Sequence, residues 1–422
     1  MATPNSRRTF LKTSVAASSA LAALAVPRTV HAGVGETIRV GLVGCGGRGT
    51  GAALDALHAD PDTKLVAVGD AFRDRAESCL VEIKADSAVA NRVQVDEEHI
   101  FSDFDNYKGV IDSCDYVLLA TPPHFRPQHF AYAIEKGKHC FVEKPVAVDV
   151  PGLHSVMESS DLAKQKGLGV LSGLCWRYAP GVQETIARVQ DGAIGEIIAI
   201  QSSYNGNGLW YRTPKPDWSR MEQQIQNWLY YTWLSGDHIG EQAIHSLDKT
   251  AWLLDDASPV RAMALAGRQQ RTDPKFGNIF DHFTVFYEYP SGVRVYFTCR
   301  QQDGCPRDVE ETVLGTKGTA RIIDNVIDGY TKWRYRGPKP NMWRNEHVEF
   351  FKKLRSGEIV NNGHYMCNST MLSIMGRLAG YTGETLTWDR LNESTERLGP
   401  TDYVWGDVPE PPVAIPGRTK FV

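Results

Sequence analysis

The alternation of hydrophobic and polar positions changes character between the two halves of the chain. In the first half, short apolar runs at 116–121 and 139–145 alternate with segments whose apolar residues follow a helical period. These segments predict helices over 128–136 and 151–166, and a further short strand follows at 169–173. Strands that alternate with helices are typical of a doubly wound parallel sheet, an α/β fold that binds ligands at the carboxyl ends of its strands.

In the second half, apolar and polar residues alternate with a period of two. The segments 197–204, 260–267 and 282–301 therefore predict strands of an open sheet. Within the last segment, the Pro-Ser-Gly sequence at 290–292 predicts the turn of a β-hairpin. The proline-rich tail at 409–416 is expected to form an extended arm on the surface.

Two helices are predicted after these strands, at 345–357 and 369–383, and each ends near a glycine. Val348, Phe351 and Leu354 share one face of the first helix, so we expect this stripe to lie in the core. A large, mainly antiparallel sheet that helices cover on one face forms an α+β domain.

A glycine-rich turn follows the first predicted strand. In GLVGCGGRG, Gly44, Gly46 and Gly49 form the pattern G-x-G-x-x-G between a strand and a helix. The first allows a tight turn, the second lets the backbone approach a pyrophosphate, and the third permits close packing of helix and strand. Asp70 ends the next strand, 21 residues past Gly49, where an acid binds the ribose 2′-hydroxyl of NAD. Together these features predict a dinucleotide-binding domain.

The arginines after this acid leave a second cofactor open. Arg73 and Arg75 could bind the 2′-phosphate of NADP, although such arginines more often lie on the solvated face of the following helix. Because the carboxylate of Asp70 would repel a phosphate, NAD is the favoured cofactor.

The N-terminus has the order of segments found in an export signal. Two arginines lie in SRRTFLK at 6–12, an apolar stretch follows at 13–26, and small residues flank a cleavage point before Gly33. The stretch is too short for a spanning helix, which needs roughly 20 apolar residues. We expect a twin-arginine signal peptide over 1–32, recognition by the twin-arginine translocase, and a folded protein outside the inner membrane, in the periplasm.

Charge and cysteine content exclude several classes of partner. Four of the 46 lysines and arginines lie in this leader, and with 50 acidic residues the mature chain has a formal charge of −8, which argues against nucleic acid or an anionic membrane. The eight cysteines form no C-x-x-C pair and no zinc-type cluster, so no metal is expected. Cys299 and Cys305 are the only near pair, and whether they are joined is left open.

Several segments resemble the Gfo/Idh/MocA family of nicotinamide-dependent oxidoreductases. They are GLVGCGGRG, ATPPHF, GKHCFVEKP, HSLDKTAWLL after an acidic residue, FFKKLRSGE and MGRLAGYTGETLTWDRL, in the family's order over nearly the whole mature chain. The resemblance implies a Rossmann domain at 33–175 and an α+β domain at 176–422 that binds substrate and builds a homodimer or homotetramer. Family members typically act on sugars, cyclitols or similar polyols, and some run hydrolysis through transient oxidation.

The resemblance also implies catalytic roles. It places Lys144 beside the nicotinamide and the reacting hydroxyl, His245 as the base, Glu241 in the place of the usual aspartate, and Asp248 as the trailing acid. Residues four apart share a helix face, so Glu241 and His245 are expected to project into one pocket. Imidazole suits proton removal near neutral pH, and an ammonium stabilises a developing alkoxide. His238 is a second imidazole close by, and the choice of base between the two is left open.

The cofactor is expected to contact both the glycine turn and the ends of later strands. A cis peptide bond is expected before the proline of Glu-Lys-Pro. Arg126 departs from the family pattern, in which histidine is common after Thr-Pro. The predicted cofactor-binding residues are Gly44, Gly46, Gly47, Arg48, Gly49, Asp70, Thr121, Pro122, His124, Glu143, Lys144 and Pro145.

Aromatic residues are dense in NWLYYTWLSGDH, next to the expected catalytic residues. They also occur in CWRYAP and in NGNGLWYRTPKPDW at 205–218, which has the glycines, prolines and polar residues of a loop. The apolar C–H faces of sugars stack on such rings, while polar groups bind the hydroxyls. The alternative is that about half of these rings are core or subunit contacts. The predicted substrate residues are Trp176, Arg177, Tyr178, Trp228, Tyr231, His238 and His245.

Export combined with a dinucleotide site predicts a captive cofactor. Because no dependable pool of NAD(H) exists outside the inner membrane, the protein is expected to fold around NAD(H) and keep it bound. Each cycle must then restore the cofactor in place, which favours a sugar–sugar oxidoreductase. The alternatives are an NAD-dependent glycosidase that oxidises and reduces the same sugar, and a non-catalytic sugar-binding protein.

Overall fold

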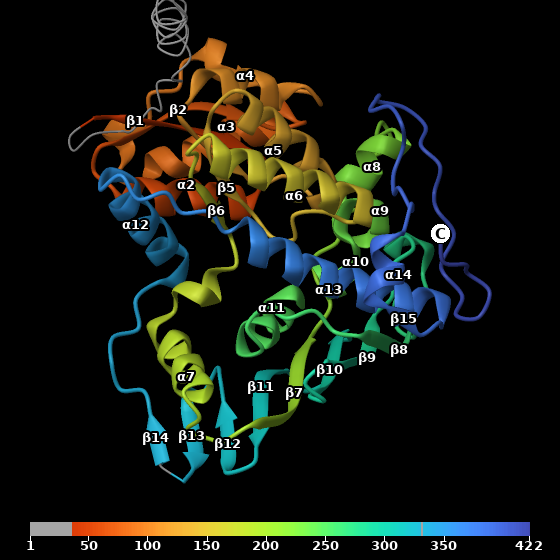
Figure 1. Cartoon of the computed structure of the whole chain (residues 1–422). Coiled ribbons are helices and arrows are strands. Elements are labelled where there is room, and N and C mark those ends of the chain that lie inside the picture. The colour runs from red at the N-terminus through yellow and green to blue at the C-terminus, as the bar shows by residue number, and fades with distance from the viewer. Residues whose placement is uncertain (1–35, 331) are drawn as a thin grey trace, which may run out of the picture.

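The computed structural model describes residues 36–330 and 332–422, so the predicted signal peptide over 1–32 lies outside the described residues. Two sheets lie at opposite ends of the molecule, and a layer of helices separates them (Figure 1). None of the described helices is both long enough and apolar enough to cross a membrane.

The N-terminal sheet is the predicted doubly wound sheet. All of its neighbouring strands are parallel, in the order β3-β2-β1-β4-β5-β6, with helices packed on both faces. Its middle strands are buried along their length because both faces are covered. The strands are β1 (Ile38–Val43), β2 (Thr63–Gly69), β3 (Ile100–Phe101), β4 (Tyr116–Leu119), β5 (His139–Val142) and β6 (Val170–Ser172), and the helices are α2 (Gly47–Ala59), α3 (Arg73–Ala85), α4 (Asn106–Ser113), α5 (Arg126–Glu135) and α6 (Val150–Gln165).

The C-terminal sheet has nine strands in the order β14-β13-β12-β11-β7-β10-β9-β8-β15. Its neighbours are antiparallel except for β7 and β10, which run parallel, and the predicted hairpin at 290–292 joins β9 to β10. The strands are β7 (Ile197–Gly206), β8 (Arg261–Gly267), β9 (His282–Glu288), β10 (Arg294–Gln301), β11 (Asp308–Gly315), β12 (Gly318–Arg321), β13 (Val326–Gly329), β14 (Lys332–Arg334) and β15 (Leu386–Thr387).

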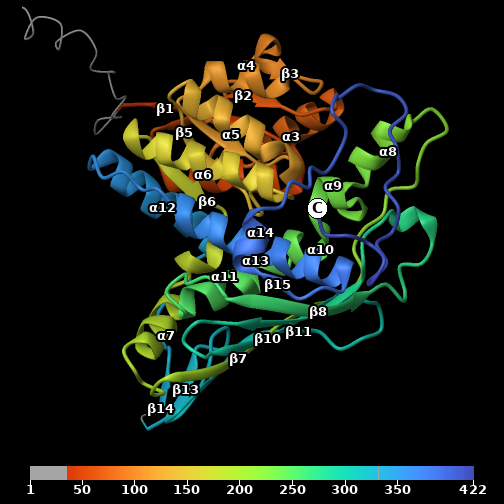
Figure 2. The ribbon, with the colours of Figure 1, turned by 45° about the vertical axis from the view of Figure 1, so that its right-hand side comes forward.

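Helices cover only one face of the large sheet. α10 (Asp237–Glu241), α11 (Ile244–Leu253) and α13 (Gly363–Thr382) lie between it and the Rossmann domain (Figure 2). The other face presents exposed apolar side chains from β7, β8, β10 and β11, because alternate residues of a strand point to opposite sides. They are Ile198, Met263, Leu265, Tyr296 and Leu314.

A helix from late in the chain returns to the first domain. α12 (Met342–Arg355) packs against α2, and Phe350, Phe351 and Leu354 join the core of the Rossmann domain (Figure 1). The prediction was wrong for Val348, which is 38% exposed, because the face that meets α2 is centred on Phe350. The helix ends with an ion pair between Arg355 and Asp60.

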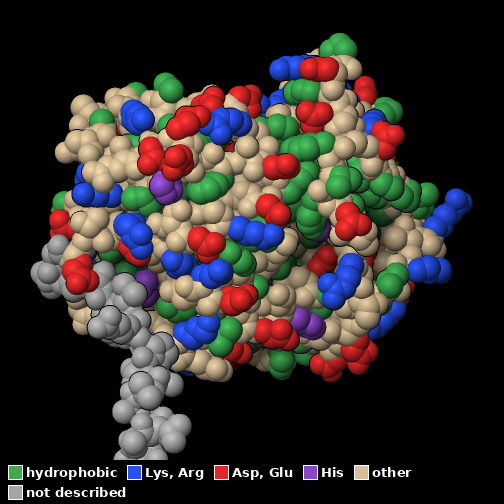
Figure 3. Space-filling view, turned by 90° about the horizontal axis from the view of Figure 1, so that it is seen from above, with side chains coloured by type: hydrophobic (Ala, Val, Ile, Leu, Met, Phe, Trp, Pro, Cys, Tyr) green, Lys and Arg blue, Asp and Glu red, His purple; other side chains and the backbone are tan. Residues whose placement is uncertain are grey.

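The C-terminal segment beyond α14 (Trp388–Asn392) contains no helix or strand, as predicted for the tail. We call residues 398–410 the C-terminal strap, since this stretch runs over the surface and contacts both domains. It lies beside α8 (Arg220–Gln226) in Figure 1, on the side where hydrophobic side chains gather among mixed charges in the view from above (Figure 3).

Candidate active site

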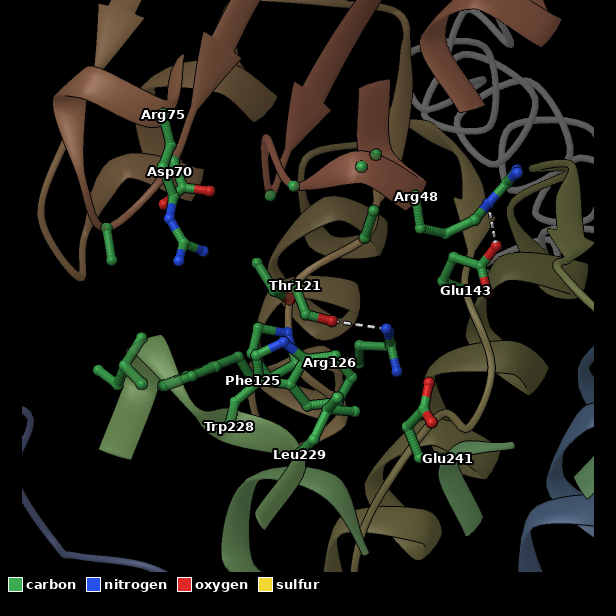
Figure 4. Close-up of a pocket in the computed structure, with 18 of the residues that line it drawn as sticks. Arg48, Asp70, Arg75, Thr121, Phe125, Arg126, Glu143, Trp228, Leu229 and Glu241 are labelled. Carbon is green, nitrogen blue, oxygen red and sulfur yellow. Dashed lines mark hydrogen bonds and ion pairs between the residues drawn. The ribbon is translucent and has the colours of Figure 1, made fainter. Parts of the chain in front are cut away.

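A cavity of about 390 Å³ lies between the two domains, where β1, β2, β4 and β5 reach their carboxyl ends (Figure 4). Ten of the twelve predicted cofactor-binding residues line it, and His124 and Pro145 do not. The second domain supplies the opposite wall with Leu209, Trp210, Arg212, Trp228, Glu241 and Gln242.

The glycine turn forms one side of this cavity. Gly44 has φ +96°, and a Cβ on it would lie 2.6 Å from the backbone of Thr121. A Cβ on Gly49 would lie 1.8 Å from the carbonyl oxygen of Gly44, so the third glycine is needed for packing. A Cβ on Gly46 or Gly47 would meet nothing within 4 Å, which leaves backbone facing open space at the start of α2. That space fits a pyrophosphate, which helix N-termini bind through free N–H groups.

Asp70 stands at the end of β2 with its carboxylate fixed. Its Oδ2 accepts a hydrogen bond from the N–H of Cys45 at 2.8 Å, and its Oδ1 accepts one from Phe72 at 3.0 Å. The side chain lines the cavity although the residue is only 7% exposed, and this burial raises the pKa of its carboxyl group. A carboxylate held in this way fits the hydroxyls of a ribose.

Arg48 lines the cavity, but its side chain turns toward acids (Figure 4). Its Nε donates to Glu143 Oε1 at 2.7 Å, and its Nη2 lies 3.8 Å from Glu346 of α12. Glu143 in turn accepts the N–H of Lys144 at 2.9 Å. Arg48 therefore ties the glycine turn to the Glu-Lys-Pro segment and to the returning helix.

Lys144 and Glu241 meet at the far end of the cavity from Asp70. Lys144 Nζ lies 3.7 Å from Glu241 Oε1 and donates to the backbone oxygen of the same residue. The peptide bond between Lys144 and Pro145 is cis, as predicted. Glu241 Oε2 is buried without a hydrogen-bond partner, and Glu241 lines the cavity. A buried, unpartnered carboxylate oxygen is costly unless a ligand uses it.

The expected single helix carrying Glu241 and His245 is wrong. α10 ends at Glu241 and α11 begins at Ile244, and between them the N–H of Ala243 donates to the carbonyl oxygen of His238, five residues back instead of four. His245 does not line the cavity, but it is near enough to Lys144 for that charge, after burial, to help lower the pKa of its imidazole well below the usual range. Its Nδ1 is buried without a partner. At neutral pH this imidazole is therefore uncharged.

Most of the predicted substrate residues lie elsewhere. His238 is buried, with Nδ1 2.8 Å from Asp237 Oδ1 and Nε2 3.5 Å from the sulfur of Cys299. Arg177 forms ion pairs with Asp248 at 2.9 Å and Asp256 at 2.7 Å, so the trailing acid is also engaged.

The aromatic residues predicted to bind substrate also lie mostly outside the cavity. Tyr178 donates its hydroxyl to Asn362 at 3.0 Å, Tyr231 is 2% exposed in an aromatic core, and Trp176 packs against the core beneath Lys249. Of the seven predicted substrate residues, Trp228 alone lines the cavity.

The sequence pattern missed several cavity residues. Arg126 is 4% exposed and donates to the backbone oxygens of Thr121, at 2.5 Å, and Pro145, so it holds two cavity segments together (Figure 4). Its position four residues after Thr121-Pro122, where it departs from the family pattern, was the available signal. Trp210 and Arg212 lie in the loop segment at 205–218, which was expected near a sugar, but the pattern did not single out these residues or Gln242.

All eight cysteines are free, so Cys299 and Cys305 are not joined. Among residues 36–330 and 332–422, no group of three His, Cys, Asp or Glu side chains is arranged to hold a metal ion.

Buried histidines predict a loss of stability in acid. Burial lowers the pKa of His129 and His347 to about 3 and that of His124 to about 4, against 6.5 when unfolded. The unfolded chain therefore binds more protons than the folded one below pH 6.5, and stability is lost as pH falls toward the folded values. Since one pH unit in a pKa corresponds to about 1.4 kcal/mol, the loss amounts to several kcal/mol.

Two buried acids act in the opposite direction. Burial raises the pKa of Glu311 to about 7 and also raises that of Glu346, so their contribution grows as pH falls to about 4.5 and then stays constant. We expect the free energy of unfolding, from urea titrations at half-unit steps, to fall most steeply between pH 4.5 and 3. A free energy that is constant or rises over this interval would contradict the assignment of buried neutral histidines.

Two sequence models of one family match the chain. The model of an oxidoreductase family with an NAD-binding Rossmann fold matches residues 38–173, and the GFO/IDH/MocA C-terminal domain matches residues 182–321. Together they cover more than half of the chain.

Relatives of known function share low identity with the chain. It is 27% identical over 209 residues to 2,7-anhydro-N-acetylneuraminate hydratase from Escherichia coli, covering 49% of this chain and 51% of that protein. It is 27% identical over 297 residues to inositol 2-dehydrogenase 3 from Saccharopolyspora erythraea, covering 69% of this chain and 75% of that protein. It is 25% identical over 294 residues to glycosyl hydrolase family 109 protein 1 from Phocaeicola vulgatus, covering 68% of this chain and 59% of that protein. The chain thus spans about half the length of the first of these proteins.

Solved structures share the fold. Aldose-aldose oxidoreductase from Caulobacter crescentus, complexed with glycerol, aligns with a TM-score of 0.63 at 18% identity, over 83% of this chain and 100% of that one. Levoglucosan dehydrogenase in complex with NADH aligns with a TM-score of 0.65 at 16% identity, over 83% and 99%. With both domains matched and a cavity that fits the dinucleotide, the chain belongs to the Gfo/Idh/MocA family of NAD-binding oxidoreductases.

Proposed function

We propose that this protein is an exported oxidoreductase that keeps NAD(H) bound and transfers hydride to and from a hydroxyl carbon of a sugar or polyol. The observation that carries the proposal is the pairing of Lys144 Nζ with Glu241 at the far end of a dinucleotide cavity, where Glu241 Oε2 has no partner. These groups can form hydrogen bonds to a hydroxyl and stabilise the charge that develops when it loses its proton. NAD is preferred to NADP because the Asp70 carboxylate stands at the ribose end.

Residues of the chain accept the proton of the substrate hydroxyl and stabilise the resulting charge. When bound, NAD supplies the site that accepts hydride. We assign the role of base to the uncharged imidazole of His245, which is near Lys144 but does not line the cavity, and the Lys144 ammonium stabilises the negative charge that develops on the oxygen. Glu241 Oε2 accepts a hydrogen bond from a neighbouring hydroxyl, which orients the substrate.

The relatives support the substrate class. An inositol dehydrogenase and an aldose-aldose oxidoreductase are both named for polyhydroxylated substrates. The glycosyl hydrolase family 109 relative supports a second candidate, an NAD-dependent glycoside hydrolase that oxidises the sugar, eliminates, adds water and reduces back. The first candidate is preferred, since no residue pattern in the chain points independently to glycoside cleavage.

Export and assembly complete the proposal. The twin-arginine pattern at 6–12 supports translocation of the folded protein to the periplasm, and a cofactor acquired in the cytoplasm must then stay bound. The apolar side chains on the outer face of the large sheet support a homodimer or homotetramer joined through that face.

The proposal is tested on protein that is purified and assayed without added NAD. Protein purified without added nucleotide is denatured, and near-stoichiometric NAD(H) is expected in the supernatant. The native protein is then offered pairs of aldoses, followed by aryl glycosides. Paired lactone and alditol would support the oxidoreductase, and phenol release with no net redox change would support the glycosidase. An empty supernatant, with activity restored only by added NAD at ordinary affinity, would refute the captive cofactor, and sugar binding without any product would refute both enzymes.

A further inference from the structure

The second domain closes the cavity over the end where Asp70 stands. Leu209, Trp210, Arg212 and Trp228 line the cavity from the second domain, and the charge of Arg212 is felt by Arg75, which is near Asp70. We propose that the adenosine half of the cofactor is held between the two domains, with Arg212 and Trp228 as its outer wall. This inference rests on the cofactor of the proposed function, but not on its substrate.

The backbone of Arg212 is held by hydrogen bonds, while its guanidinium forms no ion pair with a described carboxylate. The wholly buried side chain of Asn227 accepts the N–H of Arg212 at 2.8 Å and donates to its carbonyl oxygen at 2.9 Å. The guanidinium lies 5.2 Å from the ring of Trp210, and no carboxylate pairs with it among residues 36–330 and 332–422. An anchored arginine without a carboxylate is suited to stack its planar guanidinium on a ring such as adenine.

A second arginine approaches the same place from the first domain. Arg75 of α3 lines the cavity, donates to Gln226 of α8, and its guanidinium lies 5.2 Å from the ring of Phe72. After burial, the charge of Arg212 is among the influences that lower the pKa of Arg75, so the two cations lie close enough to repel each other. Asp70 is also near Arg75, and the planar guanidinium and indole groups on this side of the cavity can stack on adenine.

The C-terminal strap holds the wall in place. Trp405 packs on Phe104 and Phe72 at ring distances of 4.5 and 5.3 Å, and its Nε1 donates to Asp103 at 3.0 Å. Phe104 itself lines the cavity. These contacts fasten the strap to the first domain beside the expected adenosine site.

The same strap also contacts α8, which supplies Ile225 to the cavity and is followed by Trp228. The carbonyl oxygen of Gly406 accepts the N–H of Met221 at 2.9 Å, and Glu410 forms an ion pair with Arg220. The strap therefore links the two sides of the cavity, so that the adenosine half is released only when these contacts open.

The wall is tested with Arg212→Ala and the matched variant Lys215→Ala, which removes a charge from the same exposed loop but does not line the cavity. The holoprotein is chased with excess unlabelled NAD to obtain the dissociation rate, and the affinities for ADP-ribose and nicotinamide mononucleotide are measured. Arg212→Ala is expected to raise the NAD dissociation rate at least tenfold and to lower the affinity for ADP-ribose at least tenfold. The affinity for nicotinamide mononucleotide is expected to stay unchanged. Unchanged ADP-ribose affinity, or equal weakening of both fragments, would overturn the proposal.

The strap is tested with Trp405→Ala against Trp343→Ala, a similarly exposed tryptophan on α12. Trp405→Ala is expected to speed NAD release at least tenfold, while Trp343→Ala leaves the rate within twofold of the parent. Equal rates for the two variants would overturn the role of the strap. Because the readout is cofactor release, failure of the sugar oxidoreductase proposal would appear separately, as absent turnover with these differences intact.

Discussion

Replacing Lys144 with alanine is expected to slow turnover by ~10²–10⁴ while NAD stays bound, since an acid–base or charge-stabilising group typically contributes that much. Its ammonium lies beside Glu241, which is at the opposite end of the cavity from Asp70. The measurement is turnover on the substrate found in the no-cofactor screen, together with NAD content after denaturation.

The matched variant is Lys136→Ala, which removes an exposed lysine from the same domain and is expected to keep full activity. His245→Ala is expected to slow turnover in the same range as Lys144→Ala, because its imidazole is the neutral base near that ammonium. Full turnover by both site variants would show that the active site has been assigned to the wrong end of the cavity.

Replacing Gly46 with valine is expected to abolish NAD binding without unfolding the protein. A Cβ at this position meets nothing within 4 Å, so the new side chain fits the protein but occupies the space left for the pyrophosphate. The variant should purify without nucleotide and melt at the temperature of the parent protein stripped of NAD.

Gly49→Ala is the contrasting substitution in the same turn. Its Cβ would lie 1.8 Å from a backbone oxygen that cannot move independently, so we expect lost stability rather than a folded, empty protein. If Gly46→Val retained stoichiometric NAD, or if Gly49→Ala were as stable as the parent, the glycine turn would not hold the cofactor as described.

The parts of the fold that sequence could predict are those set by local periodicity. The strand before Gly44, the acid at the end of β2 and the hairpin at 290–292 each depend on residues within one element and its turn. Such patterns do not reveal a short interruption, and Gln242 separates α10 from α11 although the surrounding residues fit one continuous helix.

The candidate substrate site was harder to predict because aromatic residues serve cores as readily as ligands. Tyr231 and Trp233 lie in one buried cluster, whereas Trp228, only a few positions earlier, reaches the cavity. The difference depends on how η5 (Trp228–Tyr230) packs against the other domain. Contacts between segments distant in sequence, such as Arg48 with Glu346, leave no periodic signal at all.

The returning helix and the strap have a consequence for how the protein is made. Arg355 and Trp405 contact Asp60 and Asp103, residues synthesised 295 and 302 positions earlier. While a ribosome is still producing the last quarter of the chain, the nascent Rossmann sheet therefore lacks one of its covering helices. We expect a nascent chain stalled before α12 to be protease-sensitive and unable to capture NAD, and loading to coincide with release from the ribosome.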